Sequence, residues 1–338
     1  PFSPAVRQAS KIVVIDPAAG SMPSGIEAGR IIPLHALQEM GRRYSEGSGD
    51  AFERRACSLR PEDDLTIIYT SGTTGEPKGV LTTHAHYLFV IAAVDSAILF
   101  TDQDVNLQFL PFAHSFGRLE HFMVVAKGVT CAFARSMETI AKDLQAIRPT
   151  LLFSVPRIYE NAYSRIRSRA AAGGALQRAV FRSALWVGQR VSRRRSEGRS
   201  APWPLRAAHC VARLLVFSKI HAGLGGRLRL TISGGAPLAQ EIAEFFHTLG
   251  VLILEGYGLT ETSTVSHVNH PERYKIGTVG LPLRAVECQI APDGEILLRG
   301  PSIFKSYYRD PEGTRQAIDS DGWFHTGDIG EIDGDGFL

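Results

Sequence analysis

The stretch that decides the fold is Thr70-Ser71-Gly72-Thr73-Thr74-Gly75-Glu76-Pro77-Lys78-Gly79. It follows an apolar run at residues 65–69, which predicts a buried strand, and it precedes residues 83–100, which predict a buried helix. Glycines let a turn approach an anion closely, hydroxyl and N–H groups donate hydrogen bonds, and the lysine adds a positive charge. The pattern therefore predicts a cradle for the phosphates of a nucleotide.

This loop differs from the phosphate loop of ordinary kinases and GTPases. Gly72, Gly75 and Lys78 stand three apart and Gly79 follows, whereas that loop has four residues between its glycine and a Gly-Lys pair followed by Ser or Thr. Ordinary P-loop enzymes are therefore disfavoured. A flexible surface loop is the alternative interpretation, because Ser, Thr and Gly are also common in turns.

Length and composition describe an ordinary globular protein. The 338 residues are 44% hydrophobic and 21% charged, with a formal net charge of +3, so the chain is long enough for more than one core. The four cysteines are far apart and include no C-x-x-C pair, which indicates neither a zinc site nor a disulfide framework. A reducing, cytoplasmic location fits best, and no signal peptide is expected.

The most apolar stretch, residues 82–100, approaches the length of a membrane span. It contains His84, His86 and Asp95, so a buried helix is expected instead. The sequence predicts no transmembrane segment.

Positive charge is concentrated between Arg165 and Arg229. This stretch holds fifteen Lys and Arg residues and one acid, Glu197, so it carries +14 while the remainder of the chain carries −11. One interpretation is a solvated helical insertion at about residues 156–225. The other is attachment to an anionic membrane surface, on the inner face of the membrane. Nucleic acid is disfavoured because aromatic residues are not interleaved with the arginines.

Two helices are expected inside this basic stretch. Ser154-Val155-Pro156 predicts the start of the first, and Gly173-Gly174 predicts its end. Its apolar face is expected to contain Ile158, Tyr159, Ala162, Tyr163 and Ile166. A second helix is expected from about residue 175.

The coarse pattern along the chain predicts an α/β fold of layered parallel sheets with helices. Apolar strands are expected at residues 11–16, 65–69, 151–154, 228–233 and 251–255, alternating with helical patterns such as residues 238–249. From about residue 274 a hairpin is expected around Pro292-Asp293-Gly294. The predicted domains are therefore an α/β core at residues 1–273 and a small β-rich subdomain at residues 274–338.

Three further motifs follow the phosphate loop. They are Ser233-Gly234-Gly235-Ala236-Pro237-Leu238, Gly256-Tyr257-Gly258-Leu259-Thr260-Glu261 and Trp323-Phe324-His325-Thr326-Gly327-Asp328. In this order the four motifs resemble the core motifs of the adenylate-forming superfamily, which includes acyl-CoA synthetases, firefly luciferase and peptide-synthetase adenylation domains. The resemblance covers nearly the whole chain. It implies a fragment of the large N-terminal domain, ending before a smaller, mobile C-terminal domain.

The resemblance implies that an acid is activated by AMP transfer from MgATP. Such a step brings two anions together, so cations and oriented donors are needed. The loop from Thr70 to Gly75 and Lys78 are expected to hold the β- and γ-phosphates, and Thr260 the α-phosphate. Glu261 is expected to bind Mg²⁺, with Thr70 as a second ligand that rests on the resemblance alone.

The adenine of the nucleoside is expected to lie between a stretch of backbone with small side chains and an aromatic ring. Gly234, Gly235 and Ala236 lack bulk, so adenine can lie against them, and Tyr257 offers an aromatic face. Asp328 is the expected acceptor for the ribose hydroxyls. The neighbours of Tyr257 assigned to the same cofactor site are Glu255, Gly256 and Gly258.

The acid site is expected near Leu110-Pro111-Phe112-Ala113-His114-Ser115-Phe116-Gly117-Arg118. This segment resembles the histidine-containing segment of acyl- and aryl-CoA ligases, which implies that His114 orients the acyl carboxylate or changes rotamer between half-reactions. A packed polar histidine is the alternative. No aspartate for a substrate amine is present here, so an amino acid substrate is disfavoured. Some bacterial fatty-acid ligases have a tryptophan gate where this sequence has Arg118.

Residues Ser154-Val155-Pro156-Arg157-Ile158-Tyr159-Glu160 and the basic insertion resemble long-chain fatty acyl-CoA synthetases. The expected function is therefore a long-chain fatty acid:CoA ligase with fatty acid, ATP and CoA as substrates. A fatty acyl-AMP ligase and a medium-chain or aryl acid:CoA ligase are alternatives. The alternative of another class is a catalytically incomplete nucleotide- or lipid-binding fragment.

Overall fold

The computed structural model describes residues 10–15, 28–70 and 76–338. The chain divides into two compact units, Pro1–Pro61 and Glu62–Leu338. In the first unit a parallel pair of strands precedes two helices, and the strand expected at residues 11–16 is present. Its elements are β1 (Ile12–Val14), η1 (Ala28–Arg30), β2 (Ile31–Pro33), α2 (Leu34–Ser48) and α3 (Ala51–Cys57).

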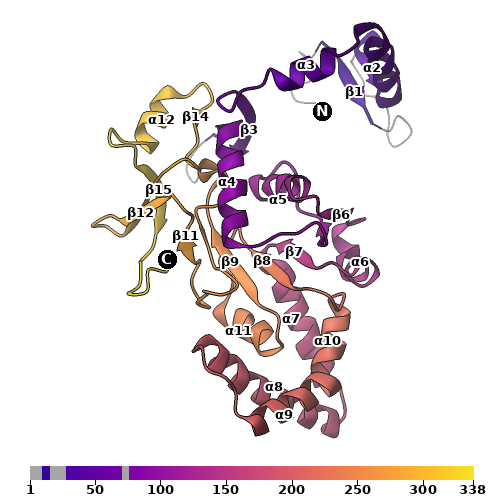
Figure 1. The fold of residues 1–338 in the computed structure, drawn as a ribbon, viewed down its shortest axis with the longest axis vertical. Coiled ribbons are helices and arrows are strands. Elements are labelled where there is room, and N and C mark those ends of the chain that lie inside the picture. The colour runs from indigo at the N-terminus through magenta and orange to yellow at the C-terminus, as the bar shows by residue number, and fades with distance from the viewer. Residues whose placement is uncertain (1–9, 16–27, 71–75) are drawn as a thin grey trace. The chain divides into compact units, whose positions relative to one another are not determined.

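The centre of the second unit is a seven-stranded sheet in the order β11-β10-β9-β8-β7-β5-β6 (Figure 1). Its strands are β5 (Val105–Gln108), β6 (Thr130–Phe133), β7 (Leu151–Ser154), β8 (Leu230–Ser233), β9 (Ile253–Tyr257), β10 (His267–Val268) and β11 (Leu281–Pro282). Strands β9, β8, β7, β5 and β6 run parallel to one another. Strand β10 pairs antiparallel with β9, and β11 pairs antiparallel with β10. The predicted parallel sheet and three of its predicted strands are thus confirmed.

Both faces of this sheet are covered. Successive side chains of a strand point to opposite faces, so Leu151 and Phe153 join a core with α4 (His84–Ala97) and α5 (Ser115–Ala126). Leu152 joins a second core, which includes α6 (Ile140–Ile147) and α11 (Gln240–Thr248). Double coverage explains why Leu151, Leu152 and Phe153 of β7 are all apolar and all buried.

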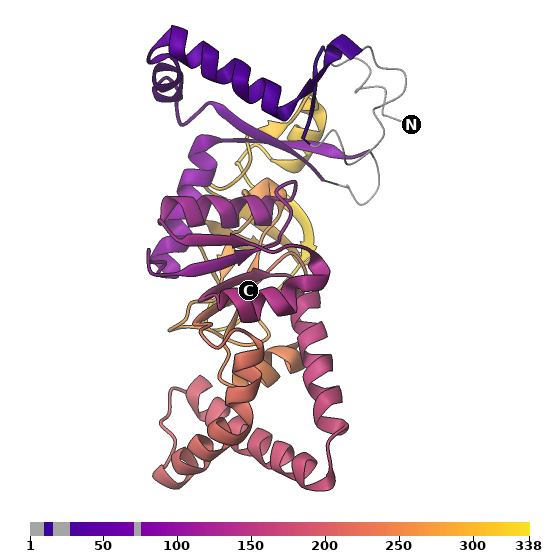
Figure 2. The same cartoon turned by 90° about the vertical axis from the view of Figure 1, so that its right-hand side faces the viewer.

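The basic stretch is helical, as expected. Its elements are α7 (Pro156–Ala171), α8 (Ala175–Ser196), α9 (Trp203–Ala212), the π-helical η3 (Arg213–Phe217) and α10 (Ser218–Gly223), and this group lies at the lower end of Figure 2. The predicted inward face of α7 is confirmed: Tyr159 is buried and its hydroxyl donates to the Ile232 carbonyl at 3.1 Å. The face opposite this contact is free to carry charge.

A separate three-stranded sheet contains β3 (Asp64–Thr70), β4 (Lys78–Thr83) and β14 (Ser306–Tyr307). Here the prediction of a loop between a strand and a helix was wrong, because residues 71–77 join two antiparallel strands and α4 begins only at His84. The β-branched residues of Gly79-Val80-Leu81-Thr82-Thr83 favour an extended backbone. The prediction that β3 is buried was also wrong: only Ile68 of this strand is buried, as in a hairpin with one face in solvent.

The C-terminal region is β-rich, as expected. Strands β12 (Glu287–Ile290), β13 (Glu295–Arg299) and β15 (Phe324–Ile329) form an antiparallel sheet, and α12 (Pro311–Ala317) lies between β14 and β15. The predicted hairpin turn joins β12 to β13, with Gly294 at a φ of +91°. The domain boundary between residues 273 and 274 stays a prediction.

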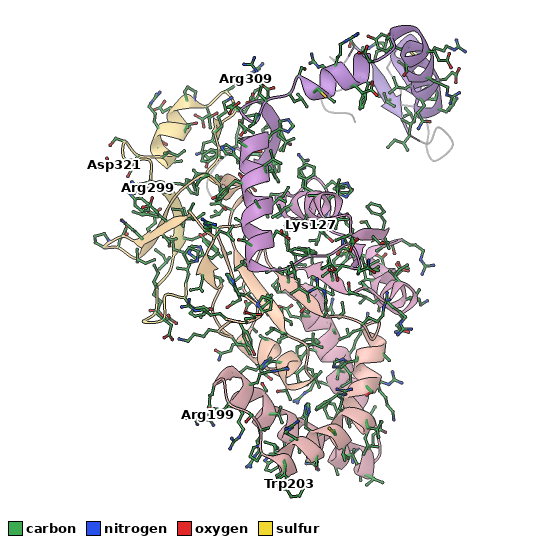
Figure 3. The ribbon with its side chains drawn as sticks, viewed as in Figure 1. Lys127, Arg199, Trp203, Arg299, Arg309 and Asp321 are labelled. Atoms are coloured by element: carbon green, nitrogen blue, oxygen red, sulfur yellow. The ribbon has the colours of Figure 1, made fainter. Side chains whose placement is uncertain are left out.

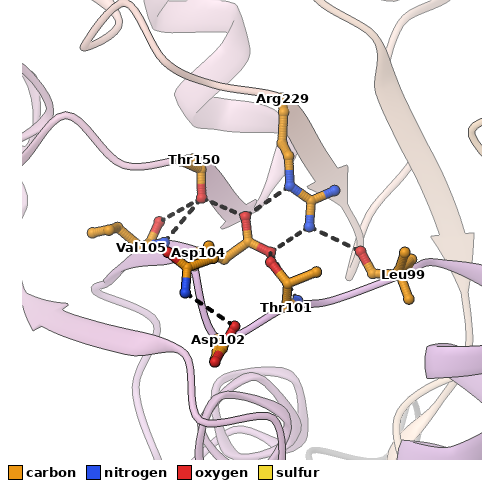
Figure 4. A network of polar contacts seen from close by, with 8 residues as sticks. Leu99, Thr101, Asp102, Asp104, Val105, Thr150 and Arg229 are labelled. Atoms are coloured by element: carbon orange, nitrogen blue, oxygen red, sulfur yellow. Dashed lines mark hydrogen bonds and ion pairs between the residues drawn. The ribbon is translucent and has the colours of Figure 1, made fainter.

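A buried polar network holds the amino ends of three parallel strands together (Figure 4). Asp104 Oδ1 accepts from Thr150 Oγ1 and from Arg229 Nε, each at 2.7 Å, and Arg229 also donates to the Leu99 carbonyl at 2.8 Å. Although burial opposes the shift, hydrogen bonds from Arg229 and Thr150 hold the pKa of Asp104 well below its usual range. The network therefore joins β5, β7 and β8 at their amino ends.

None of the helices within the described ranges has the length and apolar character that crossing a bilayer requires. The apolar stretch at residues 82–100 forms α4 instead, where Tyr87, Val90 and Val94 are buried in the protein core.

Candidate active site

Two of the four motifs and the segment that contains His114 follow strands of the seven-stranded sheet and leave it at the same end. Strands β5, β7, β8 and β9 are parallel, so the chain after Gln108, Ser154, Ser233 and Tyr257 starts at their carboxyl ends. The chain passes from β5 to β6 on one side and then to β7, β8 and β9 on the other, so its direction reverses between β5 and β7. Ligands of open α/β sheets bind at such a reversal, outside the carboxyl ends of the strands.

The residues Gly234, Gly235 and Ala236, which we call the adenine turn, follow β8. The Gly234 N–H donates to the Ser154 carbonyl at 3.2 Å, which joins the turn to the end of β7. A Cβ on Gly234 would lie 3.4 Å from the Phe116 ring, and Gly235 has a φ of +80°. The positive φ of Gly235 favours glycine, whereas a Cβ on Gly234 would make only an ordinary contact. Gly235 and Ala236 are exposed, so a flat ring can reach their backbone.

Tyr257 joins the second motif to the third. Its hydroxyl donates to Asp328 Oδ2 at 2.7 Å, across 71 positions of sequence. Burial and the Asp328 carboxylate raise the pKa of Tyr257, so its hydroxyl stays protonated and remains a donor. Asp328 is exposed, and its Oδ1 forms no hydrogen bond with any described residue. The contact brings together two residues that were predicted separately for one nucleoside site.

Close backbone contacts and burial constrain the residues beside Tyr257. A Cβ on Gly258 would lie 2.3 Å from the Thr264 carbonyl oxygen, and one on Gly256 would lie 3.2 Å from the His267 carbonyl oxygen. Glu255 is buried, its Oε2 accepts the Leu238 N–H at 3.3 Å, and burial raises the pKa of Glu255 to about 7. Glu255 thus contacts the segment that follows the adenine turn.

Lys78 and Thr70 lie at the two ends of the phosphate loop. They are cross-strand partners, Thr70 in β3 and Lys78 in β4. Lys78 is exposed, and its Nζ lies 4.8 Å from the centre of the Tyr307 ring. The predicted phosphate-binding residues between them lie outside the described residues: Ser71, Gly72, Thr73, Thr74 and Gly75.

Glu261 lies in the short helix η4 (Thr260–Thr262), just after β9, with Thr260 partly exposed beside it. The Glu261 side chain is buried, and its Oε1 accepts the Tyr307 hydroxyl at 2.9 Å. Tyr307 therefore contacts both Lys78 and Glu261. Tyr307 was not among the predicted site residues. Phe304, Tyr307 and Tyr308 are aromatic, which suits a packed segment, but the sequence does not indicate which residues this segment packs against.

The residues near Glu261 fit a magnesium ion that is held mainly by phosphates and water. Within the described ranges, no three His, Cys, Asp or Glu side chains are grouped as a metal cluster. Mg²⁺ bound to nucleotide phosphates needs only one or two carboxylates from the protein. Glu261 Oε2 forms no hydrogen bond with a described residue, so this oxygen is available.

His114 caps the start of α5. Its Nδ1 accepts the Phe116 N–H at 3.2 Å, which places the proton of a neutral ring on Nε2. Arg118, one turn later, donates to the Phe112 carbonyl at 3.1 and 2.9 Å and to the Thr66 hydroxyl. Arg118 therefore joins the His114 segment to β3, and a rotamer change of His114 would break the helix cap.

Comparison with known proteins identifies the family of this chain. The family described as AMP-binding enzyme matches residues 9–308, a range that contains the phosphate loop, the adenine turn and Glu261. The chain belongs to this family.

Two relatives illustrate the similarity within the family. The long-chain-fatty-acid–CoA ligase FadD15 of Mycobacterium tuberculosis is 36% identical over 338 residues, which cover 99% of this chain and 53% of the relative. The peroxisomal long chain acyl-CoA synthetase 6 of Arabidopsis thaliana is 34% identical over 337 residues, covering 94% of this chain and 46% of the relative. The chain spans about half the length of the curated relatives it matches.

Solved structures support the fold. The inhibitor-bound N-terminal domain of FACL13 from Mycobacterium tuberculosis has a TM-score of 0.64 and 24% identity, covering 91% of this chain and 66% of the other. Apo MatB from Rhodopseudomonas palustris has a TM-score of 0.60 and 26% identity, covering 82% and 48%. The predicted α/β class with a small β-rich region is confirmed.

Proposed function

We propose that this chain forms the ATP- and acid-binding core of a long-chain fatty acid:CoA ligase, an acid–thiol ligase that uses MgATP. The observation that carries the proposal is the meeting of motifs distant in sequence: Tyr257 contacts Asp328, and Tyr307 contacts both Lys78 and Glu261. Family membership and relatives named as long-chain ligases support the same activity.

The first half-reaction joins two anions. A carboxylate oxygen of the fatty acid attacks the α-phosphorus of ATP, the bond to the β-phosphate breaks, and pyrophosphate leaves acyl-AMP behind. In this proposal Lys78 neutralises charge on the leaving phosphates and the Thr260 hydroxyl donates to the α-phosphate. Glu261 and Thr70 would hold Mg²⁺, which supplies positive charge to the phosphate oxygens. In the second half-reaction the CoA thiol releases its proton to solvent, its sulfur attacks the acyl carbonyl, and AMP leaves as the carbon–oxygen bond breaks.

The nucleoside and the acid occupy neighbouring parts of the proposed site. Adenine lies against the adenine turn with Tyr257 on its other face, and Asp328 accepts the ribose hydroxyls. His114 Nε2–H is the donor that helix capping leaves free, and we assign it to the acyl carboxylate. Arg118 already has partners in Phe112 and Thr66, so its proposed role is to hold this loop in place.

Pyrophosphate release by the full-length gene product tests the function. The assay supplies octanoate, palmitate, stearate, benzoate and an amino acid in turn, with CoA present and absent. Release with palmitate and stearate, together with thioester formation, is the expected result. Preference for octanoate or benzoate would instead indicate a medium-chain or aryl ligase, and release without thioester would indicate an acyl-AMP ligase. ATP binding without pyrophosphate release for any acid would support the alternative of a catalytically incomplete nucleotide- or lipid-binding protein.

Replacing Glu261 by glutamine is expected to raise the half-saturating Mg²⁺ concentration by about tenfold, because a charged metal ligand is lost while the adenine turn remains. The KM for ATP at saturating Mg²⁺ should change by less than about threefold. A magnesium titration of pyrophosphate release measures both values. The exposed Glu331→Gln serves as the matched control, and an unchanged Mg²⁺ dependence in Glu261→Gln would remove the metal role.

We further propose that the basic helices attach the protein reversibly to an anionic membrane surface. Apolar side chains are exposed among the arginines: Trp203 is 79% exposed and Leu214 is 74% exposed. Arg199 and Trp203 point away from the helices in Figure 3. Lysine and arginine near an anionic surface contribute about 1 kcal/mol each, and interfacial Trp adds apolar contact. A fatty acid partitions into the same membrane, so attachment would bring enzyme and substrate together.

Reversing Arg182, Arg206 and Arg213 to glutamate is expected to abolish binding to anionic vesicles. These three side chains are exposed and form no ion pair with any residue in the described ranges, so the change removes attraction without breaking a known contact. Wild-type binding should weaken steeply with salt, since exposed charges are screened over about 8 Å at physiological ionic strength. Vesicle co-sedimentation across a salt series measures both effects.

The matched control reverses Arg284, Arg309 and Arg315, which are exposed in the C-terminal region. This variant should bind vesicles like the wild type, and both variants should turn over a soluble, shorter acid normally. If vesicle binding survives both high salt and the reversal of Arg182, Arg206 and Arg213, these arginines do not attach the protein to the membrane. The basic helices would then be a solvated insertion.

A further inference from the structure

The segment Ser302–Tyr308 lies between the element that carries Glu261 and the strand that carries Lys78. The Phe304 N–H donates to the Glu261 carbonyl at 2.7 Å. Lys305 and Tyr308 then donate to the carbonyls of Leu81 and Gly79 in β4, at 3.0 and 2.7 Å. One short segment thus fixes the backbone of the proposed metal ligand relative to the backbone of the proposed phosphate ligand.

Tyr307 repeats this connection with its side chain. It lies in β14 opposite Val80 and is 8% exposed. Its hydroxyl donates to Glu261 Oε1 at 2.9 Å, and its ring lies beneath the Lys78 ammonium, 4.8 Å from Nζ. A buried hydroxyl that loses its hydrogen-bond partner is destabilising, so the contact with Glu261 is favoured.

Two opposite charges contact different parts of the Tyr307 side chain. Within the part of the chain that is described, neither Lys78 nor Glu261 forms an ion pair. A lysine and a glutamate at neighbouring positions would otherwise tend to pair and neutralise one another. The electrons of the Tyr307 ring attract the ammonium, the Tyr307 hydroxyl donates to the carboxylate, and neither charge is used up by an ion pair.

We propose that Tyr307 is a positioning residue of the adenylation site: its hydroxyl orients Glu261 toward the divalent cation, and its ring holds Lys78 apart from Glu261 and toward the phosphates. The inference rests on the proposed roles of Lys78 and Glu261. It assigns the two roles to different parts of one side chain, so two substitutions can separate them. Tyr307→Phe removes the hydroxyl alone, and Tyr307→Leu removes the ring as well.

Tyr307→Phe should raise the half-saturating Mg²⁺ concentration by about tenfold, the size of effect typical when a residue that orients a metal ligand is changed. Its KM for ATP at saturating Mg²⁺ should stay within about threefold of wild type. Tyr307→Leu should show the same Mg²⁺ shift and also lower the maximal rate by about tenfold, since the platform for Lys78 is lost. The control is Tyr308→Phe, which removes the hydroxyl of the adjacent, exposed tyrosine.

Calorimetric titration of Mg²⁺ into the full-length gene product, saturated with a non-hydrolysable ATP analogue, provides a readout that does not depend on turnover. Tyr307→Phe should weaken Mg²⁺ binding about tenfold when Glu261 is present and should have no further effect in a Glu261→Gln background, because the hydroxyl acts on Mg²⁺ only through the Glu261 carboxylate. Thermal melting confirms that each variant is folded, and Tyr307→Phe keeps the packed ring if Tyr307→Leu does not fold.

The outcomes separate this inference from the proposed function. A Mg²⁺ shift in Glu261→Gln without one in Tyr307→Phe would overturn the role of Tyr307 and leave the function standing. No shift in either variant would remove both the metal assignment and the inference. Additive shifts in the double variant would show that Tyr307 acts on Mg²⁺ binding by another route, which also overturns the inference.

Discussion

Lys78→Ala is expected to lower the rate of adenylation by about 100- to 1,000-fold. Removing one preorganised group that stabilises developing charge commonly has an effect of this size. Lys78 is exposed at the start of β4, opposite Thr70, so its ammonium is accessible to the phosphates of the proposed ligand. The strand itself is held by its backbone pairing, which alanine preserves, so the fold should remain intact.

Exchange of labelled pyrophosphate into ATP by the full-length gene product measures this loss directly. The exposed Lys142→Ala serves as a control for removing one positive charge elsewhere in the same unit. Activity within threefold of wild type in Lys78→Ala would falsify the phosphate role. A loss of similar size in both variants would point to a change in net charge instead of a local contact.

The second large effect concerns the helix that His114 caps. Glu120 of α5 is fully buried, and its Oε1 accepts from Asn106 Nδ2 of β5 at 2.8 Å. The two remaining oxygens of this pair, Glu120 Oε2 and Asn106 Oδ1, have no other partner among the described residues. A proton on Oε2 would let the acid and the amide form two hydrogen bonds with one another. Burial raises the pKa of Glu120 to about 8, in agreement with a protonated side chain.

The free energy of unfolding should therefore fall as the pH rises. In the unfolded chain Glu120 ionises near pH 4.5, whereas in the folded protein it ionises near pH 8. The contribution of the pair is thus fully present below pH 4.5 and is lost as the pH rises toward 8, by about 5 kcal/mol at 1.36 kcal/mol per pKa unit. Cys131 also faces this pair, and burial together with the Glu120 carboxylate raises the pKa of that thiol.

Glu120→Gln isolates the effect, because a glutamine amide can form the same two hydrogen bonds with Asn106 without titrating. Urea unfolding at pH 5, 6.5 and 8.5 should show the variant gaining stability relative to wild type as the pH rises. Every other titrating group is present in both proteins, so the difference between them reports Glu120 together with its effect on the Cys131 thiol. If the free energies of unfolding of the two proteins change with pH in the same way, Glu120 is ionised in the folded protein.

The sequence carried enough information for elements whose signals are local. Pro156 and the Gly173-Gly174 pair predicted α7 and its end, because proline favours a first helical turn and glycine favours a termination. The hairpin around Gly294 was equally local. Strand β4 was missed because the glycines and the lysine before it indicated a phosphate loop, and such loops commonly precede helices. Its short extended run could not outweigh that expectation.

The candidate site divides in the same way. The motif residues Tyr257, Glu261 and Asp328 were predicted individually, and the structure brings Tyr257 to Asp328. Tyr307 could not have been predicted, since its importance depends on which residues surround it and not on its own neighbours in sequence. The role of His114 as a helix cap was also hidden, because it depends on a hydrogen bond to a backbone N–H.

The pairing of β14 with β4 has a consequence for how the protein is made. Val80 is opposite Tyr307, and Lys305 forms an ion pair with Asp64 at 2.6 Å across 241 positions. On the ribosome, the β3–β4 hairpin is therefore exposed long before its third strand is synthesised. Contacts so distant in sequence form late and slowly. We expect the nascent chain to gain its sheet core first and to bind nucleotide only after residue 307 has left the exit tunnel.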